Sequence, residues 1–161
     1  MSKSVAIAVG IVLLSGLSGC GSENPSPAVA EQPHVARPAN PNDVQAWRDY
    51  MGKVADSPSG VVRPYKFLVP SGTDAMALEQ RTQVEQALGA MAAGNSFPGN
   101  VIAIGGADPA KTADVVVAAF GKAKPASLKA LTVLYIGDDA NQARAGKIIS
   151  ASGAGFRYSR M

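Results

Sequence analysis

The hydrophobic pattern of residues 61–161 alternates between short apolar runs and longer segments of helical periodicity. The runs are rich in β-branched and aromatic residues, as buried strands are, and cover residues 61–62 with 65–69, residues 101–104 and residues 131–136. Residues 156–159 predict a fourth strand, at an edge. Strands separated by helices indicate right-handed crossovers. The pattern therefore predicts a single α/β domain with a mostly parallel sheet of about four strands.

Each expected strand leads through a short turn of small residues into the start of a helix. The turns cover residues 71–74, 105–109 and 137–139, and each contains an aspartate that can cap the helix after it. Pro109 suits the first helical position. Each helix is expected to end where a glycine adopts a left-handed conformation, at Gly94, Gly121 and Gly153. Three β-turn-α units follow from these signals.

A further helix is expected before the first strand, over residues 43–56. Its apolar face is formed by Val44, Trp47, Met51 and Val54, which fall at near-helical spacing. Asn42 or Asp43 can cap its start, and residues 57–60 stop it. Trp47, the only tryptophan, either packs on the main domain or is an exposed anchor for a partner.

Residues 21–42 are rich in proline, alanine, serine and asparagine and contain almost no large apolar side chains. Such a segment cannot bury enough surface to offset the entropy lost on ordering. A polyproline-like chain extends by about 3.1 Å per residue, so this segment could span several tens of ångströms. We therefore expect residues 20–42 to be a flexible tether and residues 43–161 to be the folded domain.

The first twenty residues form a separate pattern. Lys3 gives a cationic start, residues 5–14 form an apolar run, and Leu17-Ser18-Gly19-Cys20 follows. This order is typical of an export signal, and the run is shorter than the about 20 apolar residues of a membrane span. The tetrapeptide resembles the lipobox of bacterial lipoproteins. An ordinary signal peptide with an unrelated cysteine is the alternative.

The lipoprotein resemblance implies that residues 1–19 are a signal peptide, removed before Cys20. It also implies lipidation of Cys20, with diacylglycerol on the sulfur and a fatty acid such as palmitate on the new amino terminus. Two or more acyl chains anchor a protein stably, since each buried methylene is worth about 0.8 kcal/mol. Gly21 and Ser22 stand where lipoproteins retained at the enterobacterial inner membrane usually carry aspartate. The resemblance thus implies the inner leaflet of the outer membrane, facing the periplasm.

The distribution of charge and the cysteine content indicate which partners and which covalent links to expect. Without residues 1–19 the chain has 14 basic and 12 acidic residues, and its lysines and arginines are scattered singly. Nucleic-acid binding normally leaves a dense basic stripe, so we expect no nucleic-acid partner. Cys20 is the only cysteine, and its lipidation would leave no disulfide. The fold must then depend on packing.

Catalytic side chains are scarce in the expected domain. His34, the only histidine, lies in the tether, and no cysteine follows Cys20. The usual Ser-His, Cys-His and zinc arrangements are therefore excluded. A serine-lysine or carboxylate pair stays open, although Ser71, Ser127 and Ser150 lie in no nucleophile motif. We expect no enzymatic activity, no metal and no cofactor.

Residues 105–112 miss the phosphate-binding loop pattern by one position, because Ala110 replaces its second glycine. Such a loop directs backbone N–H groups at an anion. Pro109 lacks an N–H, and Asp108 adds a negative charge. Helix capping by Asp108 is therefore the better interpretation, and no nucleotide is expected.

Four aspartates follow the expected strands: Asp74, Asp108, Asp138 and Asp139. The carboxyl edge of a parallel sheet is where α/β proteins usually bind ligands. These carboxylates either cap helices or together bind a small ligand or a cation. Only the pair Asp138 and Asp139 has a carboxylate beyond what one cap needs.

The stretch after the third strand is similar to the peptidoglycan-binding motif of OmpA-like domains. Gly137 with Asp138 or Asp139 matches the glycine-led turn, and Arg144 matches the arginine of the next helix. The resemblance implies that these side chains clamp diaminopimelate of the cell wall. The histidine and threonine that the family carries before the aspartate are absent, and only a short stretch matches. Peptidoglycan binding is an alternative function.

The last strand alternates aromatic and basic residues. Arginines on an edge strand block aggregation, or the edge pairs with a partner by strand addition. The candidate partner contacts are Trp47, Arg157, Tyr158 and Arg160. The expected lipid anchor, the tether and the small number of catalytic groups favour a protein that binds partners over an enzyme. We expect a non-catalytic adaptor or structural component of an envelope assembly, of the secretion, conjugation or pilus type.

Overall fold

The computed structural model describes residues 35–56, 64–95 and 100–161, apart from the side chains of residues 94 and 95. The expected signal peptide, Cys20, most of the tether, the strand at residues 61–62 and the helix stop at residues 57–60 lie outside the described residues. The described elements are α1 (Val44–Ala55), β1 (Tyr65–Leu68), α2 (Ala75–Ala90), the π-helix η1 (Met91–Asn95), β2 (Val101–Gly105), α3 (Pro109–Phe120), β3 (Thr132–Gly137), α4 (Asp139–Ala151) and β4 (Gly155–Arg160).

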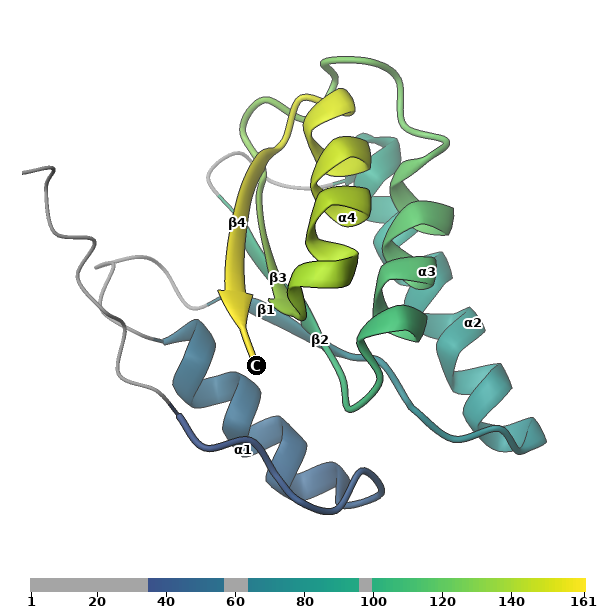
Figure 1. Cartoon of the computed structure of the whole chain (residues 1–161). Coiled ribbons are helices and arrows are strands. Elements are labelled where there is room, and N and C mark those ends of the chain that lie inside the picture. Colours follow the sequence, from purple (N-terminus) through teal and green to yellow (C-terminus); the bar gives the residue numbers. More distant parts are fainter. Residues whose placement is uncertain (1–34, 57–63, 96–99) are drawn as a thin grey trace, which may run out of the picture. The chain divides into compact units, whose positions relative to one another are not determined.

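The strands form one parallel sheet in the order β1-β2-β3-β4 (Figure 1). The predicted α/β class is thereby confirmed. The strand order, which the pattern left open, is the order of the sequence. Right-handed crossovers that always move to the next strand place their helices on one face. Accordingly, α2 packs beside α3, and α3 beside α4 (Figure 1).

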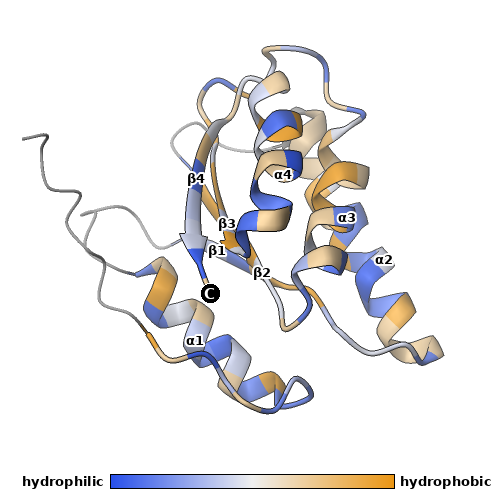
Figure 2. Cartoon of the chain, viewed as in Figure 1, coloured by the Kyte–Doolittle hydropathy of each residue, from blue (hydrophilic) through white to orange (hydrophobic). Residues whose placement is uncertain are grey.

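Two separate apolar clusters cover the central strands. On one face, α2, α3 and α4 pack on alternate residues that include Ile102, Ile104 and Val133. On the other face, α1 packs on the residues between them, such as Leu134 and Ile136. Because β2 and β3 are buried on both faces, they read as continuous apolar runs. The edge strand β4 is more polar, and Figure 2 draws it mostly pale or blue.

The ends of the helices agree only in part with the glycine signals. Gly153 has a positive φ of 88°, as predicted for a left-handed residue after α4. Gly121 instead keeps a right-handed helical conformation, with φ −63°. Its N–H donates to the Val117 carbonyl, so α3 ends here without a left-handed residue. Gly94 lies inside η1, which prolongs α2 instead of ending it. The expected helix end is therefore confirmed at Gly121 and near Gly153, and the left-handed conformation only at Gly153. At Gly94 the prediction was wrong, because the helix continues through it.

The segment before α1 lies against the domain. Val35 packs on the apolar cluster under α1, and the Asn40 carbonyl accepts a hydrogen bond of 3.0 Å from Trp47 Nε1. Asp43 caps α1 by accepting from the Ala46 N–H at 2.9 Å. Trp47 is only 2 % exposed and meets the ring of Tyr50 edge to face. Packing, and not an exposed anchor, is the role in which the structure places Trp47.

Candidate functional site

The aspartates at the carboxyl edge of the sheet cap helices. Asp74 accepts from the Ala77 N–H at 3.0 Å, and Asp108 accepts from the Lys111 N–H at 3.1 Å. Asp138 accepts from both the backbone and the side-chain amide of Asn141. The capping interpretation is confirmed for these three residues. In the part of the chain that the structure describes, no group of three or more histidine, cysteine, aspartate or glutamate side chains could hold a metal ion.

Asp139, the carboxylate beyond the cap, binds the edge strand. It accepts a hydrogen bond of 2.8 Å from the Tyr158 hydroxyl and pairs with Arg160 at 2.7 Å. Burial, together with the hydrogen bond to Asp139, raises the pKa of Tyr158 well above its ordinary value. This contact joins the start of α4 to β4. Asp138 and Asp139 are thus directed to different neighbours.

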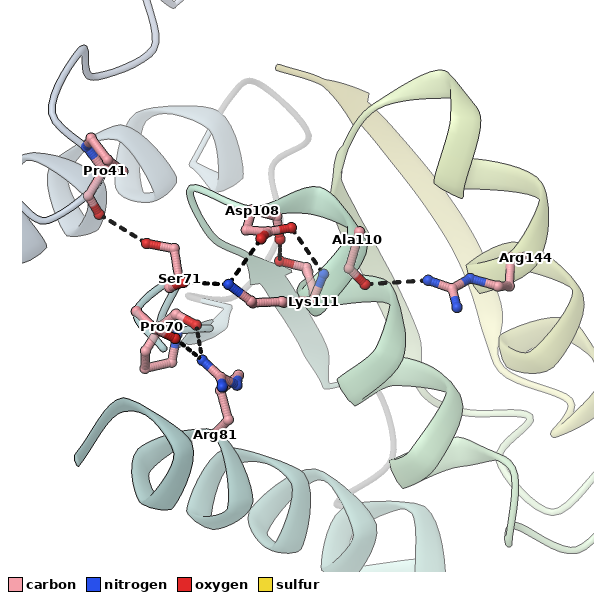
Figure 3. Close-up of polar contacts among 10 residues, drawn as sticks. Pro41, Pro70, Ser71, Arg81, Asp108, Ala110, Lys111 and Arg144 are labelled. Carbon is pink, nitrogen blue, oxygen red and sulfur yellow. Dashed lines mark hydrogen bonds and ion pairs between the residues drawn. The ribbon is translucent and has the colours of Figure 1, made fainter. Parts of the chain in front are cut away.

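Two cations hold the turn between β1 and α2 (Figure 3). Arg81 donates to the carbonyls of Pro70 at 3.0 Å and Gly72 at 2.6 Å. The Lys111 ammonium donates to the Ser71 carbonyl at 2.5 Å and pairs with Asp108 at 3.2 Å. In a phosphate-binding loop this lysine would point to the anion. Here Lys111 links the turn after β1 to the turn after β2.

The pKa of Asp108 reflects this environment. Burial by itself would raise that pKa, but the Lys111 N–H, the Lys111 ammonium and the Ala110 N–H together hold it below its ordinary value. The pKa of Asp74 is also lowered, chiefly by the Ala77 N–H. Both carboxyl groups are therefore more stable in their charged form when the protein is folded.

We expect the acid side of the stability profile to depend on Asp108. A depressed pKa contributes stability above the unfolded value of about 3.9, and this is lost as the pH falls through the folded value. Asp108→Asn keeps a capping oxygen and removes the charge. Urea unfolding at pH 5.5 and at pH 2.5 should show a smaller loss of stability for this variant than for the parent. Equal losses would contradict the assigned role.

Tyr135 of β3 is buried near the carboxyl edge of the sheet. Tyr135 is 0 % exposed, and its hydroxyl donates to the Pro109 carbonyl at 3.0 Å. Burial raises its pKa to about 12. Its ring stacks on Tyr158 at 6.3 Å and occupies the space over Gly137. The ring belongs to the apolar cluster under the helices, so Tyr135 is a packing residue with a satisfied hydroxyl.

The residues similar to the OmpA-like motif already have partners. Arg144 is 45 % exposed, pairs with Asp114 at 2.7 Å and donates to the Ala110 carbonyl (Figure 3). It also contacts the side chain of Asn141, which in turn binds Asp138. The side-chain amide of Asn141 therefore links Asp138 to Arg144. Both would have to exchange partners to clamp a wall amino acid.

The other candidate contacts spread over β4. Arg160 is 74 % exposed but paired with Asp139, and Tyr158 turns toward the helical face. Arg157 is half-buried. Tyr158 and Arg160 thus meet at Asp139, whereas Trp47 is buried under α1 in the cluster on the other face of the sheet.

A groove that the sequence did not indicate lies along the outer side of β1. Its volume is about 530 Å³. Its walls come from the start of α1 and the residues before it, the end of β1 with the turn that follows, the first three turns of α2, and Ala107. Apolar wall residues include Val44, Phe67, Met76 and Val84. The volume falls in the range of about 300–1,000 Å³ that ligand sites occupy. Met76 and Val44 are the clearest sequence signal, because both are apolar residues near a capped helix start.

The described helices include none that is long and apolar enough to cross a membrane. Comparisons of the chain with protein-family models, with curated proteins and with solved structures found no match.

Proposed function

We propose that this chain is a lipoprotein of the bacterial outer membrane and acts in the periplasm as a non-catalytic adaptor of an envelope assembly. Anchoring rests on the lipobox-like Leu17-Ser18-Gly19-Cys20 and the apolar run before it. The proline-rich segment after Cys20 would hold the domain away from the bilayer. The domain would then meet a protein partner in the periplasm.

The observation that carries the adaptor role is the groove of about 530 Å³ beside β1. Its walls combine exposed apolar side chains with few charges, as partner-binding surfaces do. At the carboxyl edge, where an α/β enzyme would bind its substrate, Asp74 and Asp108 cap helices. Asp108 and Asp139 also pair with Lys111 and Arg160. Binding therefore fits the described surface better than turnover.

Lipid attachment is tested by labelling cells with a palmitate analogue. The parent chain should incorporate the label and sediment with outer-membrane fractions. Cys20→Ser should abolish incorporation and release the chain from the membrane. Labelling of the serine variant, or its unchanged sedimentation, would contradict the anchor.

The adaptor role is tested by crosslinking the native chain in cells and identifying the proteins that co-purify in mild detergent. A defined set of envelope proteins, lost when the domain is deleted after the tether, supports the proposal. Recovery of peptidoglycan fragments that depends on Arg144 would instead support wall binding. Arg144→Lys is the matched control, since it keeps the charge and loses the bidentate geometry.

A further inference from the structure

The outer edge of β1 has backbone groups that pair with no strand among residues 35–56, 64–95 and 100–161. The Val69 N–H donates to the Gly105 carbonyl at 2.8 Å, so Val69 and the residues two and four before it face β2. In a parallel strand the residues between them direct their N–H and C=O groups to the other side. These are Lys66 and Leu68. No strand of the described part pairs with them.

Two of the exposed apolar side chains line the groove at this edge. The large hydrophobic residues exposed among the described positions are Val44, Tyr65, Met76 and Leu78, at 50 %, 48 %, 69 % and 58 %. All four belong to α1, β1 or α2, the elements that flank the outer side of β1. Val44 and Met76 line the groove itself. Exposed apolar side chains at a groove are typical of an interaction surface.

The opposite edge of the sheet differs in its chemistry. Strand β4 carries Arg157 and Arg160, and Arg160 is 74 % exposed. Charged side chains on an edge discourage pairing with another strand. Strand β1 carries one charged residue, Lys66, against two on β4, and both Lys66 and Arg160 have an acidic partner. The groove adjoins β1 and includes no residue of β4. The edge better suited to strand addition is therefore β1.

The shape of the site favours a narrow occupant. A two-fold dimer would place the same hollow surface against itself, which leaves a void where close packing is needed. An added strand lies about 4.8 Å from its neighbour and fits between two helices. Alternate side chains of such a strand would point toward α1 and toward α2. An extended peptide fits this groove better than a second copy of the chain.

Two charged side chains line the groove, Arg48 and Asp74. Asp74 caps α2 and already offsets the positive dipole end of that helix. The guanidinium of Arg48 has neither an ion pair nor a hydrogen bond to a described residue. An acidic side chain of the occupant would be stabilised beside Arg48.

We propose that β1 is a strand-addition site for an extended segment of a protein partner, with apolar residues at alternate positions and an acidic residue opposite Arg48. The segment pairs with the outward backbone groups of Lys66 and Leu68. Its apolar side chains contact Val44 and Met76. This proposal rests on the adaptor function and adds the place and chemistry of the contact.

Photocrosslinking in cells locates the occupant. A benzoylphenylalanine at Gln83, on the α2 wall of the groove, should crosslink to one segment of another envelope protein that has this alternating pattern. The same group at Lys147, exposed on α4, is the matched control and should not label that segment. Crosslinks to a second copy, to lipid, to the chain itself or to nothing would overturn the proposal.

A synthetic peptide of the crosslinked segment tests the pairing with the full chain in detergent. N-methylation at alternate peptide positions, those facing β1, should weaken binding at least tenfold, and methylation between them should not. Met76→Glu should weaken binding at least tenfold, whereas Leu78→Glu, an exposed residue of α2 outside the groove, should leave it unchanged. Arg48→Glu should be rescued by a peptide with lysine in place of its acidic residue.

The two proposals fail in different ways. An envelope partner that still co-purifies with Met76→Glu and Arg48→Glu would overturn the strand-addition site and leave the adaptor function standing. The converse result is also distinguishable. If the chain isolated from cells carries no lipid but still binds the peptide with the N-methyl pattern, the anchored adaptor is overturned and the strand-addition site stands.

Discussion

Trp47→Ala is expected to destabilise the domain by about 3–5 kcal/mol, the usual cost of truncating a buried aromatic residue. Trp47 is 2 % exposed and packs with Tyr50 and Met51 over the face of the sheet that holds Leu134 and Ile136. Its loss removes the largest side chain of this cluster. The result should be a lower urea midpoint with α1 partly detached from the sheet.

Circular dichroism is the suitable probe, because Trp47 is the only tryptophan and its fluorescence disappears with the substitution. Trp47→Phe is the control. It keeps most of the buried area and removes the hydrogen bond to the Asn40 carbonyl, so a loss of about 1–2 kcal/mol is expected. Val44→Ala, at a half-exposed position of the same helix, should have little effect. A similar loss for Val44→Ala and Trp47→Ala would contradict the packing described for α1.

The periodicity of the chain contains most of the information about the fold. Strands buried on both faces produce continuous apolar runs, and this is why residues 101–104 and 131–136 predict β2 and β3 to within one residue. Asp74, Asp108 and Asp138 predict helix starts because a cap acts through neighbouring residues only. Gly121 shows the limit of such signals. Glycine also serves where a carbonyl lies too close for a Cβ, and at Gly121 that atom would lie 2.6 Å from the Val117 oxygen.

The candidate site was less accessible to sequence analysis for a physical reason. A cap is local, whereas the residues that line the groove run from Pro41 to Ala107, which are 66 residues apart in the chain. No periodicity relates Val44 to Met76. The carboxyl edge attracts attention in α/β sheets because ligands bind where the strand order reverses. In a sheet ordered β1-β2-β3-β4 no such reversal occurs, so the crevice expected from that rule does not form.

The sequential strand order also explains why the groove lies at β1. Helices α2, α3 and α4 cover one face, and α1 covers the other. The first strand therefore lies between α1 and α2 at the end of the sheet, with its outer backbone groups between two helices. Strand β4 has α4 on one face and arginines at its edge. The two edges differ because the topology gives only one of them a helix on each side.

Gly106→Ala is expected to destabilise the fold by about 3 kcal/mol and to weaken peptide binding at the groove. A Cβ at this position would collide with the Val69 carbonyl oxygen, so the chain on one side or the other would have to move. Val69 is buried and lines the groove, and its N–H pairs with Gly105. The added methyl group should push the end of β1 away from β2 and spread the groove.

The matched control for Gly106→Ala is Gly89→Ala in α2, where a Cβ would meet nothing within 4 Å. Alanine there should stabilise the protein by about 0.5–1 kcal/mol, because glycine is the poorer helix former. Urea unfolding of both variants measures the contrast, and opposite signs are expected. A neutral Gly106→Ala would mean that β1 and β2 can separate at their carboxyl ends without cost. The β1 edge would then be too mobile to hold a partner strand in a fixed register.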